Sequence, residues 1–220
     1  FLDTAHKNFP NKPIFVSEFG QRADGINVSG KLDDEYKTQQ ARDQYLRDMI
    51  AAVRARPFVI GASLWTFNDY RSRYPGTNAN GYRWWGMIDH NRQPRSAYHA
   101  MREEFSPVVI TQIVADTVNT PQGITIHMQV GLMCRKDFPS YTLRGYELRY
   151  ELLDAADQPL DRKGTLKLEP LKPGANPGYG FSINVTEKQA RTKVRIQIVR
   201  PTGFVVAERT KEITPDAAQR

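Results

Sequence analysis

The sequence predicts two units of different fold class, an α/β unit over residues 1–106 and an all-β sandwich over residues 107–220. In the first unit, continuous apolar runs of strand length alternate with helical segments, an order typical of parallel strands joined by crossover helices. After Pro107 the chain changes to short segments in which apolar and polar residues alternate, separated by turn sequences. The boundary is therefore expected at residues 106–107.

The first unit begins with an apolar run at residues 13–19, which ends at Gly20 and predicts a buried strand. A long helix is expected from Asp33 to the residue before Pro57, because proline cannot continue it. One apolar stripe recurs along this helix at helical spacing, formed by Ala41, Tyr45, Met49, Ala52 and Val53. A second buried strand is expected at residues 58–65.

A loop rich in Asn, Gly, Arg and aromatic residues follows at residues 66–93, and Pro94 then opens a final helix. A loop of this length in a compact domain is usually functional or disordered, and its aromatic residues argue against disorder. Two strands cannot close a barrel, and apolar runs of this kind need cover on both faces. The neighbouring strands are therefore expected from sequence outside this chain or from another copy of it.

The second unit contains short strand-like segments over about 110 residues, the pattern of an immunoglobulin or fibronectin type III sandwich. Turn sequences separate them, including TPQG at residues 120–123 and PGANPG at residues 173–178. The expected strands are residues 108–114, 124–130, 146–152, 165–168, 181–185, 194–199 and 204–209. The Cys…Trp…Cys pattern of antibody domains is absent, since Cys134 is the only cysteine.

Composition and charge argue against several classes of function. The net charge is +7, but basic and acidic residues are interspersed, so a solvated surface is favoured over a nucleic-acid site. No apolar run is long enough to span a bilayer. The histidines are scattered without ligand spacing, so no metal site is expected.

The candidate site residues lie where the two predicted strands end. Glu18 ends the first strand, and a carboxylate at such a strand end next to apolar walls could attack the anomeric carbon of a sugar. Trp65 ends the second strand and could present its face to a pyranose ring. The polar residues that follow it could bind hydroxyls, namely Asn68, Asp69, Arg71 and Arg73. Trp84 could form a platform for a further sugar. The alternatives are a capping or ion-paired Glu18, a core position for Trp65, and packing at the rim for Trp84 or Trp85. For the polar loop residues the alternative is solvated loop charges, which is the favoured interpretation for Arg71 and Arg73.

Three motifs resemble glycoside hydrolase family 2, whose members include β-galactosidases, β-glucuronidases and β-mannosidases. Residues 12–20 (KPIFVSEFG) resemble the strand that carries the nucleophile, and residues 61–70 (GASLWTFNDY) resemble the last barrel strand. Residues 84–98 (WWGMIDHNRQPRSAY) resemble the segment that leads into the final helix. The resemblance implies that residues 1–106 are the C-terminal quarter of a (β/α)₈ TIM barrel.

The resemblance also implies a retaining mechanism with Glu18 as nucleophile and no cofactor. The family's acid/base Glu follows an Asn on an earlier strand, and no Asn-Glu pair precedes Glu18, so the isolated chain is expected to be inactive. The expected substrate is a terminal β-linked sugar, with a galactoside favoured because the Asn-x-Lys triplet of the family's glucuronidases is absent. The rival hypothesis is a non-catalytic module that binds carbohydrate or protein.

Overall fold

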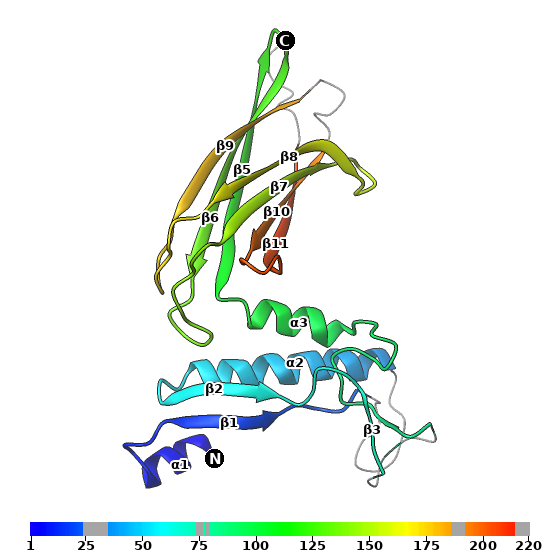
Figure 1. Ribbon diagram of the computed structural model, residues 1–220, viewed down its shortest axis with the longest axis vertical. Coiled ribbons are helices and arrows are strands. Elements are labelled where there is room, and N and C mark those ends of the chain that lie inside the picture. Colours follow the sequence, from blue (N-terminus) through cyan, green and yellow to red (C-terminus); the bar gives the residue numbers. More distant parts are fainter. Residues whose placement is uncertain (24–34, 74–76, 78–79, 186–191, 214–220) are drawn as a thin grey trace. The chain divides into compact units, whose positions relative to one another are not determined.

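A computed structural model describes residues 1–23, 35–73, 77, 80–185 and 192–213. The chain divides into two compact units, Phe1–Phe105 and Ser106–Arg220. Strands make up most of the regular structure, with few helices (Figure 1).

The first unit contains a parallel pair of strands, β1 (Ile14–Phe19) and β2 (Val59–Leu64), as the sequence predicts. Ile14 lies opposite Val59 and Phe19 opposite Leu64, so both strands end at the same edge. The helices are α1 (Leu2–Asn8), α2 (Glu35–Arg54) and α3 (Ser96–Glu104), and α2 contacts both β2 and α3 (Figure 1). The short strands β3 (Tyr70–Arg71) and β4 (Tyr82–Arg83) pair antiparallel inside the expected loop.

The buried face of α2 differs from the expected one. Arg42, Leu46 and Ile50 are buried, whereas Ala41 and Tyr45 of the predicted stripe are exposed. Val53 of the predicted stripe is buried as expected, and Met49 and Ala52 are half-buried. Both sets have helical spacing, and they differ by one position, which is about 100° around the helix axis. The apolar pattern was therefore wrong at Ala41 and Tyr45, because the buried Arg42 beside them fits no apolar pattern. The expected helix start at Asp33 lies outside the described residues.

The β1–β2 pair leaves apolar side chains in solvent. Phe15 on β1 is 57% exposed and Ile60 on β2 is 64% exposed, although both positions were expected to be buried. Among the described residues this parallel sheet has two strands and does not close into a barrel. The side chains that would cover Phe15 and Ile60 are therefore not supplied by the described part of the unit.

The second unit is a β-sandwich of antiparallel sheets, with strand orders β5-β6-β9 and β11-β10-β7-β8. The strands of the first sheet are β5 (Val108–Thr120), β6 (Gly123–Cys134) and β9 (Gly178–Val185). Those of the second are β7 (Glu147–Leu153), β8 (Pro159–Lys167), β10 (Lys193–Val199) and β11 (Val205–Glu212). One core joins the sheets, with Ile126 and Val130 from β6 and Leu148 and Ile196 from the opposite sheet.

Candidate active site

A hollow of about 1050 Å³ lies at the C-terminal edge of β1 and β2. The strand ends contribute Glu18, Phe19, Gly20 and Trp65, and helix α2 contributes Tyr45 and Met49. The loop after β2 contributes Tyr70, Arg71, Ser72, Arg73, Arg83 and Trp85. Since parallel strands place their carboxyl ends at one edge, residues far apart in sequence meet here, as they do in the ligand sites of parallel α/β folds.

Gly20 lets the two strand ends approach closely. A Cβ atom at this position would lie 2.1 Å from the carbonyl oxygen of Trp65, so the backbone of one of the two strand ends would have to move. The backbone N–H of Trp65 donates to the carbonyl of Phe19 at 2.8 Å, which fixes the same approach. The Glu18 carboxylate and the Trp65 indole are thus held at one rim of the hollow.

The side chains of Glu18 and Trp65 are both accessible. Glu18 is exposed, and Trp65, which directly follows the apolar strand β2, is 41% exposed. The indole N–H of Trp65 donates to the hydroxyl of Tyr70 at 3.2 Å, and the two rings meet edge to face at 80° with centroids 5.6 Å apart. Tyr70 therefore orients an indole whose apolar face is free to contact a ligand.

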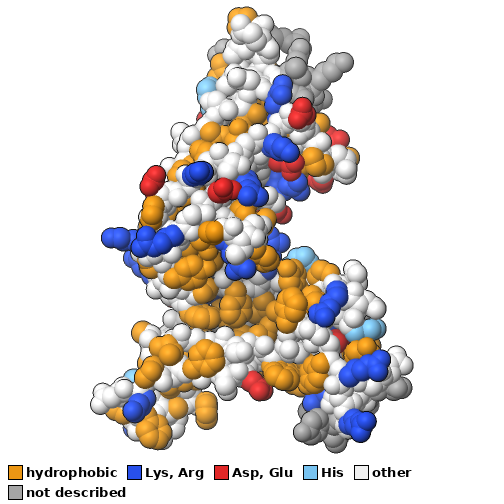
Figure 2. Space-filling model, in the orientation of Figure 1, with side chains coloured by type: hydrophobic (Ala, Val, Ile, Leu, Met, Phe, Trp, Pro, Cys, Tyr) orange, Lys and Arg blue, Asp and Glu red, His pale blue; other side chains and the backbone are white. Residues whose placement is uncertain are grey.

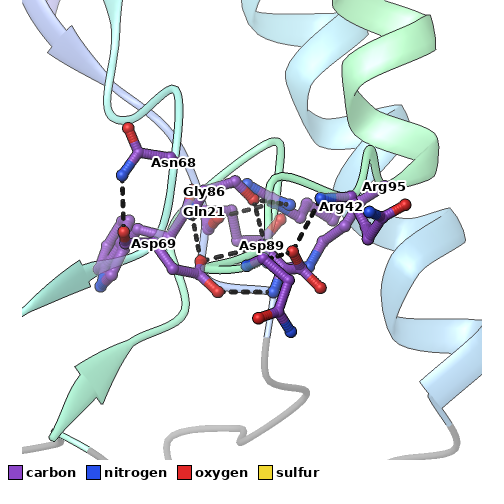
Figure 3. A network of polar contacts seen from close by, with 10 residues as sticks. Gln21, Arg42, Asn68, Asp69, Gly86, Asp89 and Arg95 are labelled. Carbon is purple, nitrogen blue, oxygen red and sulfur yellow. Dashed lines mark hydrogen bonds and ion pairs between the residues drawn. The ribbon is translucent and has the colours of Figure 1, made fainter.

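A buried ion pair supports the loop behind the hollow (Figure 3). Asp69 has no exposed side-chain surface, and its Oδ2 lies 2.7 Å from Nη2 of Arg95. Its Oδ1 accepts from Nη1 of Arg95 at 3.0 Å and from the backbone N–H of Gly86 at 2.9 Å. A Cβ at Gly86 would lie 2.3 Å from the backbone nitrogen of Asp69, so the two segments touch through their main chains.

Arg42 of α2 completes this support from the helix side. Its guanidinium donates to the carbonyls of Gln21 at 2.9 Å, Gly86 at 3.0 Å and Trp85 at 2.7 Å (Figure 3). Burial, together with the charge of Arg95, lowers the pKa of Arg42 to about 10. The side chain remains a cation at neutral pH, and it donates hydrogen bonds to backbone carbonyl groups that lie outside the strands and helices.

Arg42 is not among the site residues predicted from the sequence. The available signal was its spacing, since Arg42, Leu46 and Ile50 recur every four residues on one face of α2. A charged residue in line with buried aliphatic ones indicates a paired or hydrogen-bonded cation.

The structure brings together only some of the predicted site residues. Glu18 and Trp65 line the hollow, whereas Asn68, Asp69 and Trp84 are not among its lining residues. The Asn68 amide donates to the Asp69 carbonyl at 2.7 Å, and the Asp69 carboxylate is enclosed by its partners, so it offers no surface to a sugar hydroxyl. Trp84 is 37% exposed, and its neighbour Trp85 lines the hollow instead.

Two other classes of site find no support in the described residues. No group of His, Cys, Asp or Glu there could hold a metal ion. In the same part of the chain, no helix is long and apolar enough to cross a membrane.

Neither protein-family models nor curated proteins match the chain, but solved structures do. A glycosyl hydrolase family 2 member from Bacteroides cellulosilyticus is 15% identical over 49% of this chain and 15% of its own, with a TM-score of 0.40. A putative β-galactosidase from Bacteroides fragilis is 14% identical over 48% of this chain and 17% of its own, with a TM-score of 0.38. An FMN-binding β-glucuronidase from Faecalibacterium prausnitzii is 13% identical over 100% of this chain and 29% of its own, with a TM-score of 0.40.

The chain thus spans less than a third of the length of each of these structures. They are glycoside hydrolases of family 2 or carry the names of activities found in it. At these identities and TM-scores, a function can be assigned only from the residues of the chain itself.

Proposed function

We propose that the chain is the C-terminal part of a retaining, exo-acting β-glycosidase of the family 2 type, with residues 1–106 as the last quarter of its TIM barrel. The observation that carries this proposal is one arrangement in the first unit. The exposed carboxylate of Glu18 and the accessible indole of Trp65 share one hollow at the carboxyl edge of two parallel strands. In β/α barrels this edge is where catalytic side chains gather.

The chemistry is a double displacement. The Glu18 carboxylate attacks the anomeric carbon, and the bond from that carbon to the leaving oxygen breaks as a second carboxyl group protonates that oxygen. Water, deprotonated by the second group, then attacks the anomeric carbon and releases Glu18. The two carboxyl groups stand about 5 Å apart in retaining enzymes. We propose that the second group comes from a strand outside this chain, and no step requires a cofactor.

The exposed apolar surface of the first unit supports a continuation of the sheet. Phe15 and Ile60 stand in solvent on β1 and β2, and burying one such side chain stabilises a protein by about 1.5–3 kcal/mol. Further barrel strands, from the same polypeptide or from another copy, would cover them. Trp65 offers the C–H face of a terminal sugar an apolar surface, and a galactoside is the favoured substrate.

The second candidate function is a module that binds carbohydrate without hydrolysing it. The exposed indole of Trp65 favours this candidate as well, because stacking on a sugar ring needs no catalytic carboxylate. The two candidates differ in what they require of Glu18. A binding module keeps its affinity when the carboxylate becomes an amide, whereas a glycosidase loses its nucleophile.

The test is Glu18→Gln in the full-length protein, assayed on a panel of chromogenic β-glycosides. We expect turnover of at least one β-glycoside by the unmodified protein and a fall of at least about a thousandfold in kcat for the variant. Glu169→Gln is the matched control, because Glu169 is an exposed carboxylate of the sandwich. Equal rates for all three proteins would overturn the assignment. The chain by itself is expected to show no turnover.

A further inference from the structure

The charged side chains that line the hollow are mainly basic. The lining contains Arg71, Arg73 and Arg83, and Glu18 is the only acidic residue among its described members. The β3–β4 pairing brings the arginines together, since Arg71 lies opposite Tyr82 and Tyr70 opposite Arg83. Figure 2 shows basic side chains gathered over the part of the first unit that carries β3. The hollow thus presents more positive than negative charge to a ligand.

Aromatic residues, rather than acids, contact Arg71 and Arg83. Nε of Arg71 donates to the Tyr82 hydroxyl at 3.3 Å, and its guanidinium carbon lies 5.2 Å from the centre of that ring. The guanidinium carbon of Arg83 lies 5.6 Å from the ring centre of Trp85. Among the described residues, Arg71, Arg73 and Arg83 have no acidic partner. Their charges are therefore not neutralised in the described part of the hollow.

The lining also holds more hydrogen-bond donors than acceptors. Guanidinium and indole groups donate only, and Nε of Arg83 and Nε1 of Trp85 are buried without an acceptor in the described structure. A neutral sugar brings hydroxyls that donate as often as they accept. A carboxylate or sulfate brings acceptors only, and it matches the planar guanidinium fork in a bidentate way.

We propose that the glycoside bound in this hollow carries an anionic group, a carboxylate or a sulfate, and that Arg71 and Arg73 bind it. The inference rests on the proposed function, and it replaces the neutral galactoside favoured there with an acidic β-glycoside as the substrate. Arg71 and Arg73 are exposed, so they can reach a ligand, while Arg83 lies half-buried against Trp85 and adds to the positive field. The anionic group would lie on the sugar whose anomeric carbon faces Glu18 or on the neighbouring sugar of the substrate.

The test compares three nitrophenyl substrates with the full-length protein: a β-galactoside, a β-galacturonide and a 6-sulfated β-galactoside. We expect kcat/KM to be at least about tenfold higher for one of the charged substrates, and this preference to shrink as salt is added. Comparison of the two charged substrates identifies the anion. A higher kcat/KM for the neutral galactoside would overturn the inference.

The variants Arg71→Gln and Arg73→Gln test the assigned residues, with Arg162→Gln, on the exposed face of β8, as control. Each of the first two should raise KM for the charged substrate by about tenfold and raise KM for the neutral substrate much less, since the charge-assisted hydrogen bond that is lost forms only with the anionic group. An equal loss on charged and neutral substrates would show that the arginines serve the loop structure and would overturn the inference.

Equilibrium binding separates this inference from the proposed function. Galacturonate and galactose are titrated calorimetrically into the full-length protein and into its Arg73→Gln variant. Binding of galacturonate that is lost in Arg73→Gln, together with no hydrolysis of any glycoside, would support the anion site and contradict the glycosidase. Hydrolysis that depends on Glu18 but shows no preference for charge would support the glycosidase and contradict the anion site.

Discussion

Gly20 is the residue at which the backbone geometry of the hollow is most constrained. The Cβ of an alanine there would lie 2.1 Å from the Trp65 carbonyl oxygen, so Gly20→Ala must push the ends of β1 and β2 apart. We expect a loss of about 1–3 kcal/mol in the free energy of unfolding of the first unit, the usual cost of overpacking. Chemical denaturation followed by Trp fluorescence measures it. Gly178→Ala on β9 is the control, because no atom lies within 4 Å of that Cβ.

Glu104 makes the junction of α2 and α3 sensitive to pH. Burial alone would raise the pKa of this carboxyl group, but hydrogen bonds and charge from Arg54 and Arg47 outweigh burial and hold the pKa below its ordinary value of 4.5. The stability that Glu104 contributes is therefore present above pH 4.5 and is lost as the pH falls through the lowered pKa. Acid should weaken the packing of α3 on α2.

The corresponding prediction concerns Glu104→Gln. We expect the substitution to cost about 1 kcal/mol at pH 7 and progressively less as the pH is lowered from 7 toward 2, because the native carboxyl group takes up a proton as the pH falls through its lowered pKa. Denaturation midpoints of both proteins across this pH range measure the difference. A cost that stays the same at every pH would show that Glu104 acts by shape rather than by charge.

The candidate site could be predicted from the sequence only in part. Glu18 and Trp65 lie near the ends of apolar runs of strand length, so the sequence predicted their places at the ends of β1 and β2. Asp69 looked like a sugar ligand because its neighbours are polar, but its partner Arg95 lies 26 residues further on. Contacts over such distances have no local signature, which also explains why the role of Arg42 was missed.

At the scale of elements, the Asp69–Arg95 pair links the loop after β2 to the segment before α3. Asp69→Asn keeps the shape of the side chain but leaves the guanidinium of Arg95 without its counter-charge, at an expected cost of about 3 kcal/mol. The measurement is the denaturation midpoint of the first unit, with Asp161→Asn on the exposed face of β8 as control. Equal midpoints for the two variants would contradict a supporting role for Asp69.

Most strands and helices were predictable because their signals are local. The expected strand at residues 181–185 corresponds to β9 and that at 194–199 to β10, each within a few residues. β8 begins earlier than residues 165–168, since its exposed first half pairs with β7 and carries no apolar pattern. The short helix α1 was missed because it buries no residue and therefore shows no apolar stripe.

At the scale of the whole molecule, the two units differ in how complete their cores are. The sandwich encloses one core shared by both sheets, whereas β1 and β2 leave Phe15 and Ile60 in solvent. We expect residues 107–220 to fold alone with a cooperative transition, because that core needs no side chain from the first unit. Calorimetry of this segment checks the expectation, and a chain without a heat-absorbing transition would contradict it.

The central claim is that Glu18 is the nucleophile of a retaining glycosidase, and trapping of the covalent intermediate tests it most directly. A 2-fluoro glycoside with a good leaving group slows both displacement steps, so the glycosyl-enzyme should accumulate in the full-length protein. Digestion and mass spectrometry should then place the sugar on the peptide that contains Glu18, and Glu18→Gln should form no adduct. An adduct on another carboxylate, or an adduct that forms equally in Glu18→Gln, would contradict the claim.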